Sequence, residues 1–267
     1  MRYWKGSIVL SPTRDQPLLR EVARSAFITH NQLFESLKLD YCASSRKAFN
    51  NRVLRLVTHG LLVRREGLIC SREVVYSVSS SGASALGGSL VDSSGKAGSS
   101  GLLMLRHCLD LNEIHLALKR SGSLVYWMPE TEIRSRSDLT SYGYWKYYDA
   151  VVVVRLAGQD CKFALEYERT PKAARQYVAI RERIEQETAI RHFLYLVPNH
   201  DFMWFIAEKL SQCRRAVYIG LFQDFLEQTL ALPVRRSGSP ATLTLASVLA
   251  PGKEAQHSGE LFSGVAV

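Results

Sequence analysis

The stretch Tyr148–Thr170 constrains the fold more than any other part of the chain, because it combines two apolar runs with three carboxylates. Asp149 precedes a run of one alanine and four valines. A turn at Gly158 then leads into a second apolar run, which carries Glu166 and Glu168. Runs of this length and composition, separated by a glycine turn, are typical of paired strands. The stretch therefore predicts a β-hairpin inside an apolar sheet.

The carboxylates of this hairpin are expected to share a surface. Alternate side chains of a strand point to one face, so Lys162, Glu166 and Glu168 should project together. Carboxylates gathered at the ends of adjacent strands repel one another unless a cation lies between them. A divalent metal ion would supply that cation, and so would a basic partner helix. The residues alone leave both explanations open.

The composition places the chain among globular proteins with a basic front third. The chain has 267 residues, 46% of them hydrophobic, which is enough for a buried core and favours two modest domains. The formal net charge is +9, and residues 1–79 hold 13 Lys and Arg against 6 Asp and Glu. This charge imbalance favours a polyanionic partner, and double-stranded DNA is the leading candidate.

Cysteine usage and hydropathy indicate a soluble protein. No run of about 18 apolar residues is present, and the first ten residues lack the apolar core of a signal peptide. Five cysteines are scattered without a Cys-x-x-Cys pair: Cys42, Cys70, Cys108, Cys161 and Cys213. We expect reduced thiols, a cytoplasmic location and no membrane partner.

Residues 1–80 have the pattern of a winged helix-turn-helix domain. Apolar spacing predicts three helices, at about residues 18–27, His30–Leu37 and Arg46–Val57. Ser44 or Ser45 is expected to cap the third helix, and Gly60 to end it. Two β-rich runs follow, Leu61–Arg65 and Val74–Val78. Three helices followed by a hairpin is the order of a winged helix, in which the third helix enters the major groove.

The third helix and the hairpin carry the expected DNA contacts. Arg46, Asn50 and Asn51 are the candidates for base edges. The side chains expected near phosphates are Lys47, Arg52, Arg55, Arg64, Arg65 and Arg72. The alternative is a winged helix used for protein contacts, whose charged face is merely solvated.

The remaining chain divides into a linker, a second domain and a tail. Residues 81–101 are rich in Ser and Gly and are expected to form a flexible linker. Residues 233–267 show no clear period and are expected to form a flexible tail or a docking peptide. Residues 102–232 lie between them and contain the hairpin.

The second domain is predicted to have the element order αβββαβ. A helix at about 107–120 precedes a short strand, Leu124–Met128, and a polar excursion through Asp138. The hairpin follows, then a helix that starts at Pro171, and then a strand, His192–Val197. A further helix, strand and helix complete the domain. The expected fold class is therefore α/β (α+β), with a mixed sheet.

The acids in this order carry a resemblance to known proteins. An acid opening the second strand and an acid pair ending the third resemble the PD-(D/E)XK nuclease core. More narrowly, four segments following a winged helix resemble the plasmid replication-relaxation family and its mobile-element relatives. They are HCLDLN at 107–112, WMPE at 127–130, DAV at 149–151 and LEYERT at 165–170.

The resemblance implies a metal-dependent hydrolytic site. It gives Asp149 and Glu166 as ligands of Mg²⁺ or Mn²⁺, and gives the next position, here Glu168, to a Lys that orients the attacking water. Glu168 departs from that pattern, and Tyr148 stands where a Pro is expected. A glutamate at this position is chemically able to act as a general base or a further ligand.

Other residues are candidates to complete this site. Substitute cations would come from Lys162, Lys172 or Arg175, and further ligands from Glu113, Glu130 or Glu132. In the alternative interpretation, Glu166 and Glu168 form salt bridges with nearby cations in an inactive fold that only positions partners. Those cations are Arg169, Lys172 and Arg175.

Two functional hypotheses follow from these patterns. The first is a DNA-binding accessory or regulatory protein of a mobile element, which joins other proteins of that element and whose nuclease-like domain serves nucleoprotein assembly. The second is an active Mg²⁺-dependent endonuclease in transposition or defence, with Asp149, Glu166 and Glu168 as its catalytic residues. A protein scaffold without a DNA role is a third class, which the basic front disfavours. A two-fold DNA site would make a homodimer natural.

Overall fold

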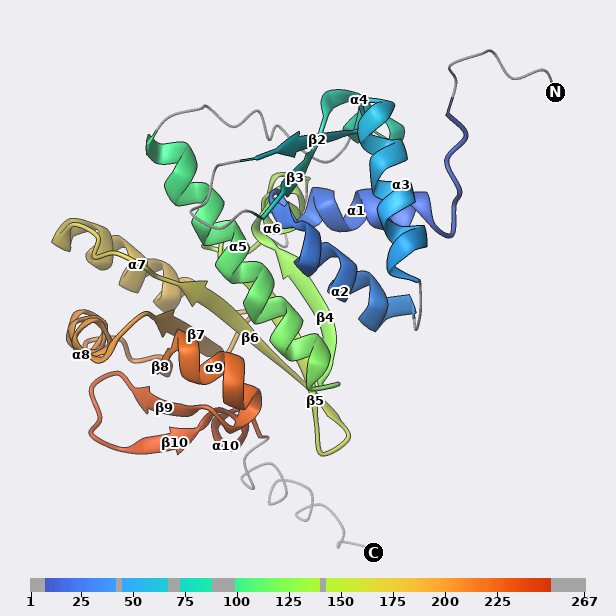
Figure 1. The fold of residues 1–267 in the computed structure, drawn as a ribbon. Coiled ribbons are helices and arrows are strands. Elements are labelled where there is room, and N and C mark those ends of the chain that lie inside the picture. The colour runs from blue at the N-terminus through green and yellow to red at the C-terminus, as the bar shows by residue number, and fades with distance from the viewer. Residues whose placement is uncertain (1–7, 42–44, 67–72, 88–98, 140–142, 251–267) are drawn as a thin grey trace, which may run out of the picture.

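The structure is a computed structural model that describes residues 8–41, 45–66, 73–87, 99–139 and 143–250. It is a mixed α/β protein in which a small helical unit at the N-terminus packs against one helix of a larger unit built on a sheet (Figure 1). None of the helices in the described part of the chain is long and apolar enough to cross a membrane.

The N-terminal unit contains three helices and a small antiparallel sheet. The helices are α1 (Asp15–Ser25), α2 (His30–Tyr41) and α3 (Arg46–Thr58). The strands are β1 (Ile28–Thr29), β2 (Leu62–Arg65) and β3 (Val75–Val78), in the spatial order β1-β3-β2. The Ser45 hydroxyl accepts a hydrogen bond from the Ala48 amide at 3.2 Å, and Gly60, with φ of 68°, ends α3.

The helical faces of this unit meet in one apolar core. Leu18 of α1, Leu33 of α2 and Phe49 of α3 are each at most 1% exposed. The order of helices and strands agrees with the sequence-based prediction, and α4 (Ser80–Ala85) follows the hairpin. The assignment of this unit as a winged helix stays a prediction.

The larger unit is built on a seven-stranded mixed sheet with the spatial order β10-β9-β8-β7-β6-β5-β4. The β6–β7 and β7–β8 pairs are parallel, and the remaining pairs are antiparallel. The strands are β4 (Leu124–Pro129), β5 (Ala150–Leu156), β6 (Gln159–Tyr167), β7 (His192–Val197), β8 (Val217–Leu221), β9 (Pro233–Arg236) and β10 (Thr242–Thr244).

Helices cover both faces of the sheet. One face packs against α5 (Ser99–Arg120), α9 (Phe222–Gln228) and α10 (Leu245–Leu249). The other face packs against α6 (Glu130–Leu139), α7 (Ala174–Gln186) and α8 (His200–Lys209). A short 3-10 turn, η1 (Thr229–Ala231), joins α9 to β9. Because both faces are covered, the inner strands are apolar almost throughout, and β7 is buried over five of its six residues.

The N-terminal unit is bonded directly to α5. The Gln32 side chain donates to the Leu109 carbonyl at 2.9 Å, and Asn112 donates to the Phe27 carbonyl at 2.7 Å. An apolar cluster that includes Phe27, Val75 and Leu105 fills the contact. Helix α5 therefore lies between the small unit and the sheet, and holds the two in a fixed relation (Figure 1).

Three parts of the predicted organisation are corrected by the structure. Residues 130–139 form α6 rather than a polar excursion, because Ile133 is fully buried under the sheet. The segment predicted as a flexible linker begins with the short helix α4, at residues 80–85, and α5 starts inside its other end, at residue 99. Residues 88–98 lie outside the described part of the chain.

The predicted flexible tail is also wrong for residues 233–249. These residues form β9, β10 and α10, and therefore extend the larger unit beyond residue 232. Val234 is fully buried and Leu245 is 1% exposed, so both are part of the core. Each of these elements is short, and their stability comes from packing on the sheet rather than from a local pattern. Residues 251–267 lie outside the described part of the chain.

Candidate functional site

The acids predicted from the sequence meet at one end of the β5–β6 pair. In the antiparallel register Ala150 lies opposite Leu165, so Asp149 comes immediately before β5 at the position opposite Glu166. Glu168 follows two residues later, just after β6 ends. We call Asp149, Glu166 and Glu168 the carboxylate centre. The hairpin register thus brings the first two acids to the same strand end.

Asp149 is held by a histidine from α5 and by the backbone of β6. His107 Nε2 lies 3.1 Å from Asp149 Oδ1, and the Tyr167 amide donates to Oδ2 at 2.7 Å. The His107 ring stacks on the Tyr167 ring with an interplanar angle of 7°.

The pKa values of this pair move apart in the direction that favours an ion pair. Burial alone would lower the pKa of His107, but the hydrogen bond and the charge of Asp149 outweigh it and raise the pKa. Burial opposes ionisation of Asp149 in the same way. The contact with His107 outweighs it, and the pKa of Asp149 lies below its ordinary value. An imidazolium–carboxylate pair is therefore the favoured state.

Glu166 is paired with a lysine that the sequence analysis did not single out. Lys146 lies in the segment before β5, is 8% exposed, and donates from Nζ to Glu166 Oε1. Burial raises the pKa of Glu166 to about 7, the charge of Lys146 opposes this rise, and the charge of Asp149 adds to it. The carboxyl group of Glu166 thus lies between a cation and an anion in a water-poor site.

Lys146 reaches this position because its segment alternates like a strand. Lys146 and Tyr148 point inward, whereas Trp145 and Tyr147 are 57% and 42% exposed. The ammonium of Lys146 also lies 4.9 Å from the centre of the Tyr148 ring, within range of a cation–π contact. In the sequence, the alternation of Lys146 and Tyr148 with Trp145 and Tyr147 is the pattern that indicates an inward-pointing Lys146.

Glu168 is tied to α7 and to the segment that leads into it. The Tyr177 hydroxyl donates to Oε1, and Lys172 Nζ lies 2.9 Å from Oε2. Lys172, one of the predicted substitute cations, is therefore at the site. Glu168 is only 4% exposed, so this bonding satisfies a carboxylate that would otherwise be costly to bury.

Lys162 is not part of the carboxylate centre. It is exposed, lies opposite Val153 in the register, and is separated from Glu166 by four residues, or about 13 Å along the strand. The expectation that it shares the site is therefore wrong, although Lys162 and Glu166 are an even number of residues apart and so belong to the same face of the strand. Pleating fixes the face of a side chain but not its distance along the strand.

The other candidate ligands and cations have separate partners. Glu113 accepts a hydrogen bond from Gln32, and Glu130 pairs with Arg134. Glu132 likewise pairs with Arg136. Arg169 pairs with Asp110 at 3.4 Å, and Arg175 is exposed. None of these contacts involves the carboxylate centre.

Protein donors contact most of the oxygens of the carboxylate centre. Five of its six carboxylate oxygens already accept a hydrogen bond from a protein donor. Each carboxylate oxygen has two lone pairs, so further acceptor sites remain beside these hydrogen bonds. Within the described part of the chain, no three His, Cys, Asp or Glu side chains are grouped so that they could hold a metal ion. Asp149 pairs with His107 and Glu166 pairs with Lys146, and the assignment of these two acids as metal ligands stays a prediction.

The exposed side of α3 carries several of the predicted DNA contacts. Lys47, Asn50 and Asn51 are exposed. Arg46 is exposed too, but its guanidinium donates to Asn31 Oδ1 at 2.6 Å and lies 4.4 Å from the centre of the Phe34 ring. The helix therefore presents cationic and amide side chains together.

Arg52 and Arg55, which were predicted to contact phosphates, form ion pairs within the protein. Both lie against Asp15 of α1, which is fully buried, and Arg52 Nε is 3.3 Å from Asp15 Oδ1. These arginines anchor α3 to α1, so their assignment to phosphates is not supported. In the hairpin, Arg64 pairs with Glu66, and Arg65 lies over the Phe27 ring. Arg72 lies outside the described residues.

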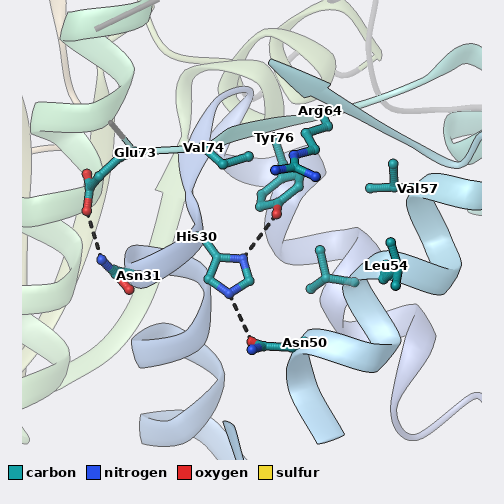
Figure 2. Close-up of a pocket in the computed structure, with 10 residues that line it drawn as sticks. His30, Asn31, Asn50, Leu54, Val57, Arg64, Glu73, Val74 and Tyr76 are labelled. Atoms are coloured by element: carbon teal, nitrogen blue, oxygen red, sulfur yellow. Dashed lines mark hydrogen bonds between the residues drawn. The ribbon is translucent and has the colours of Figure 1, made fainter. Parts of the chain in front are cut away.

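A pocket of about 480 Å³ opens between α3 and the hairpin (Figure 2). Its lining includes Leu54 and Val57 from α3, and Arg64 and Tyr76 from the strands. Figure 2 shows the His30 ring between Tyr76 and Asn50, with a hydrogen bond to each. His30 was not among the predicted site residues, because a lone histidine at the start of a helix has no distinguishing local pattern.

Comparison with known proteins does not assign a family. No family model matches the chain, and no curated protein matches it. Among solved structures, FokI restriction endonuclease bound to DNA is similar, with a TM-score of 0.26 and 11% sequence identity. The match covers 83% of this chain and 45% of that chain, so this chain spans less than half of that enzyme. Similarity at this level assigns neither a fold family nor an activity.

Proposed function

We propose that this chain is a DNA-binding accessory protein, in which the N-terminal unit acts as a winged helix and the sheet domain serves nucleoprotein assembly. The observation that carries the proposal is the exposed side of α3, where Lys47, Asn50 and Asn51 lie within about one helical turn and the helix has no carboxylate. Lysine suits phosphates, and amide side chains suit base edges. The basic balance of residues 1–79 supports the same partner.

An assembly role for the sheet domain is supported by the carboxylate centre. Its acids are compensated by protein cations and donors, as they would be in a domain that positions partners. The meeting of Asp149 and Glu166 at one strand end favours the second candidate, a Mg²⁺-dependent or Mn²⁺-dependent endonuclease. In that case Lys146 would have to leave Glu166 before the two acids could hold the ion. The resemblance of four short segments to plasmid replication-relaxation proteins supports a mobile-element setting with other protein partners.

The DNA-binding proposal is tested by the double variant Lys47→Ala/Asn51→Ala. Fluorescence anisotropy with duplex DNA selected by the wild-type protein should show an affinity loss of about tenfold. The slope of log affinity against log salt should also fall by about 1, because one phosphate contact is removed. Arg214→Ala is the matched control for charge, since Arg214 is 91% exposed and lies far along the chain from α3. Equal losses in both variants would remove α3 as the DNA contact.

A cleavage assay separates the assembly role from the endonuclease. Supercoiled plasmid incubated with the protein and Mg²⁺ or Mn²⁺ should remain intact. Nicking that Asp149→Ala abolishes would overturn the assembly role and support the second candidate.

A further inference from the structure

The pocket between α3 and the hairpin contains a hydrogen-bond chain that reaches the surface. The Tyr76 hydroxyl on β3 lies 3.1 Å from His30 Nδ1, and His30 Nε2 lies 3.0 Å from Asn50 Oδ1 (Figure 2). The His30 ring also packs on the Phe49 ring, with centroids 4.9 Å apart. Three elements, β3, α2 and α3, therefore fix one amide side chain of the candidate DNA face.

The chemistry of the three side chains decides which atom donates and which accepts in each of these hydrogen bonds. An amide oxygen can only accept, so the proton of a neutral His30 lies on Nε2 and is donated to Asn50. Nδ1 is then the acceptor for the Tyr76 hydroxyl. Burial lowers the pKa of His30, and the charges of Arg46 and Arg64 lower it further, although the bond to Asn50 opposes them. Burial also raises the pKa of Tyr76, so the phenol keeps the proton that it donates.

These hydrogen bonds limit the groups that Asn50 can offer to a base. Its carbonyl oxygen is engaged by His30, whereas its amide group has no hydrogen-bond partner among the residues that the structure describes. An unrestrained asparagine recognises adenine through both groups, accepting from N6 and donating to N7. His30 occupies one of the two lone pairs of that oxygen, so only the N–H donors of Asn50 remain fully free for a base. Guanine presents two acceptors in the major groove, O6 and N7, and no donor.

We propose that His30 is a positioning residue that makes Asn50 select guanine over adenine in the major groove. This inference rests on the proposed DNA-binding function. The neighbouring Asn51 is exposed and has no such tie in the described structure, so it provides an internal contrast.

The hydrogen-bond chain itself is tested without DNA. Long-range nitrogen–proton NMR of the imidazole distinguishes the two neutral tautomers, and His30 in the free protein should be protonated on Nε2. Tyr76→Phe removes the donor to Nδ1 and should increase the fraction of the other tautomer. Protonation of His30 on Nδ1 in the wild-type protein would overturn the proposal, whatever the protein does with DNA.

The base preference is tested by selection from a random duplex library. Asn50→Ala identifies the base pair that Asn50 contacts, as the position where preference disappears. At that position the wild-type protein should bind guanine about tenfold more tightly than adenine. His30→Phe keeps a ring against Phe49 but frees the Asn50 oxygen, so the preference should move to adenine. Tyr76→Phe is the second variant, with an intermediate shift expected.

The outcomes separate the DNA-binding function from the positioning role of His30. If the wild-type protein binds no duplex at low salt, the proposed function and this inference fall together. If it binds duplex but selects adenine at the Asn50 position, or if His30→Phe leaves the preference unchanged, only the positioning role of His30 is overturned.

Discussion

At the scale of single residues, each acid of the carboxylate centre is paired with a cationic side chain of the protein. Lys146 and Glu166 are both less than 10% exposed, and their ion pair joins the segment before β5 to the end of β6. A buried ion pair adds little stability compared with apolar packing, but removing one partner leaves an uncompensated charge. The pair therefore fixes the structure of the carboxylate centre more than it stabilises the fold.

Replacing Lys146 by Met should destabilise the protein by about 3 kcal/mol, because Glu166 then stays buried beside Asp149 without a cation. The double variant Lys146→Met/Glu166→Gln should recover most of the loss. Urea denaturation at pH 7 measures both free energies of unfolding. A loss that the second substitution fails to reduce would show that Lys146 acts through packing rather than through its charge.

The same site should make stability depend on pH. Burial raises the pKa of Glu166 to about 7, so over the range from its ordinary value of 4.5 to about 7 the folded state binds a proton that the unfolded state has released. The stability from this group is complete below the ordinary value and is lost as pH rises through about 7, at no more than about 1.4 kcal/mol per pH unit. Denaturation between pH 5 and 8 should show this slope, and Glu166→Gln should reduce it. Equal slopes would contradict the assignment.

At the scale of elements, the orientation of α3 depends on a buried carboxylate in α1. Asp15 is fully buried and lies against Arg52 and Arg55, so α3 is fastened along the side that faces α1. Lys47 and Asn51, which precede Arg55 along the same stripe of the helix, stay exposed. Two arginines that look like DNA contacts in the sequence are therefore structural residues.

Asp15→Ala should destabilise the N-terminal unit by about 1–3 kcal/mol, because the carboxylate also accepts the Ser11 amide at 2.7 Å. Glu66→Ala is the matched control, since it removes the exposed pair with Arg64 and should cost under about 1 kcal/mol. Denaturant titration followed by circular dichroism compares the two. Similar losses would mean that Asp15 does not anchor α3.

At the scale of the whole molecule, the sheet is completed by the last described elements of the chain. β9 pairs with β8, β10 pairs with β9, and α10 covers the face that α5 and α9 also cover. On the outer side of α5, the N-terminal unit is bonded through Gln32 and Asn112. The molecule is thus one continuous packed body around α5 and the sheet.

Truncation after Leu232 should therefore abolish folding, because it removes four core side chains: Val234, Leu245, Val248 and Leu249. Each contributes roughly 1.5–3 kcal/mol, and their sum is comparable with the whole stability of a typical domain, about 5–15 kcal/mol. Truncation after Ala250 removes none of the described core and should leave the melting transition intact. A soluble, cooperatively folding chain ending at Leu232 would show that the last strands are dispensable.

The sequence by itself determined the local elements and the position of the acids. Apolar periodicity predicted α2, α3, β6 and β7, the Ser45 cap was among the predicted choices, and the hairpin pattern placed Asp149 and Glu166 at the ends of neighbouring strands. These features depend on residues within one element or one hairpin, where spacing fixes geometry. The tertiary structure alone decided which partner each charge receives. Lys146 and Glu166 are 20 residues apart, and Asp15 and Arg55 are 40 apart, so no local period records either contact. The same holds for β9, β10 and α10, whose short segments are ordered by the sheet on which they pack.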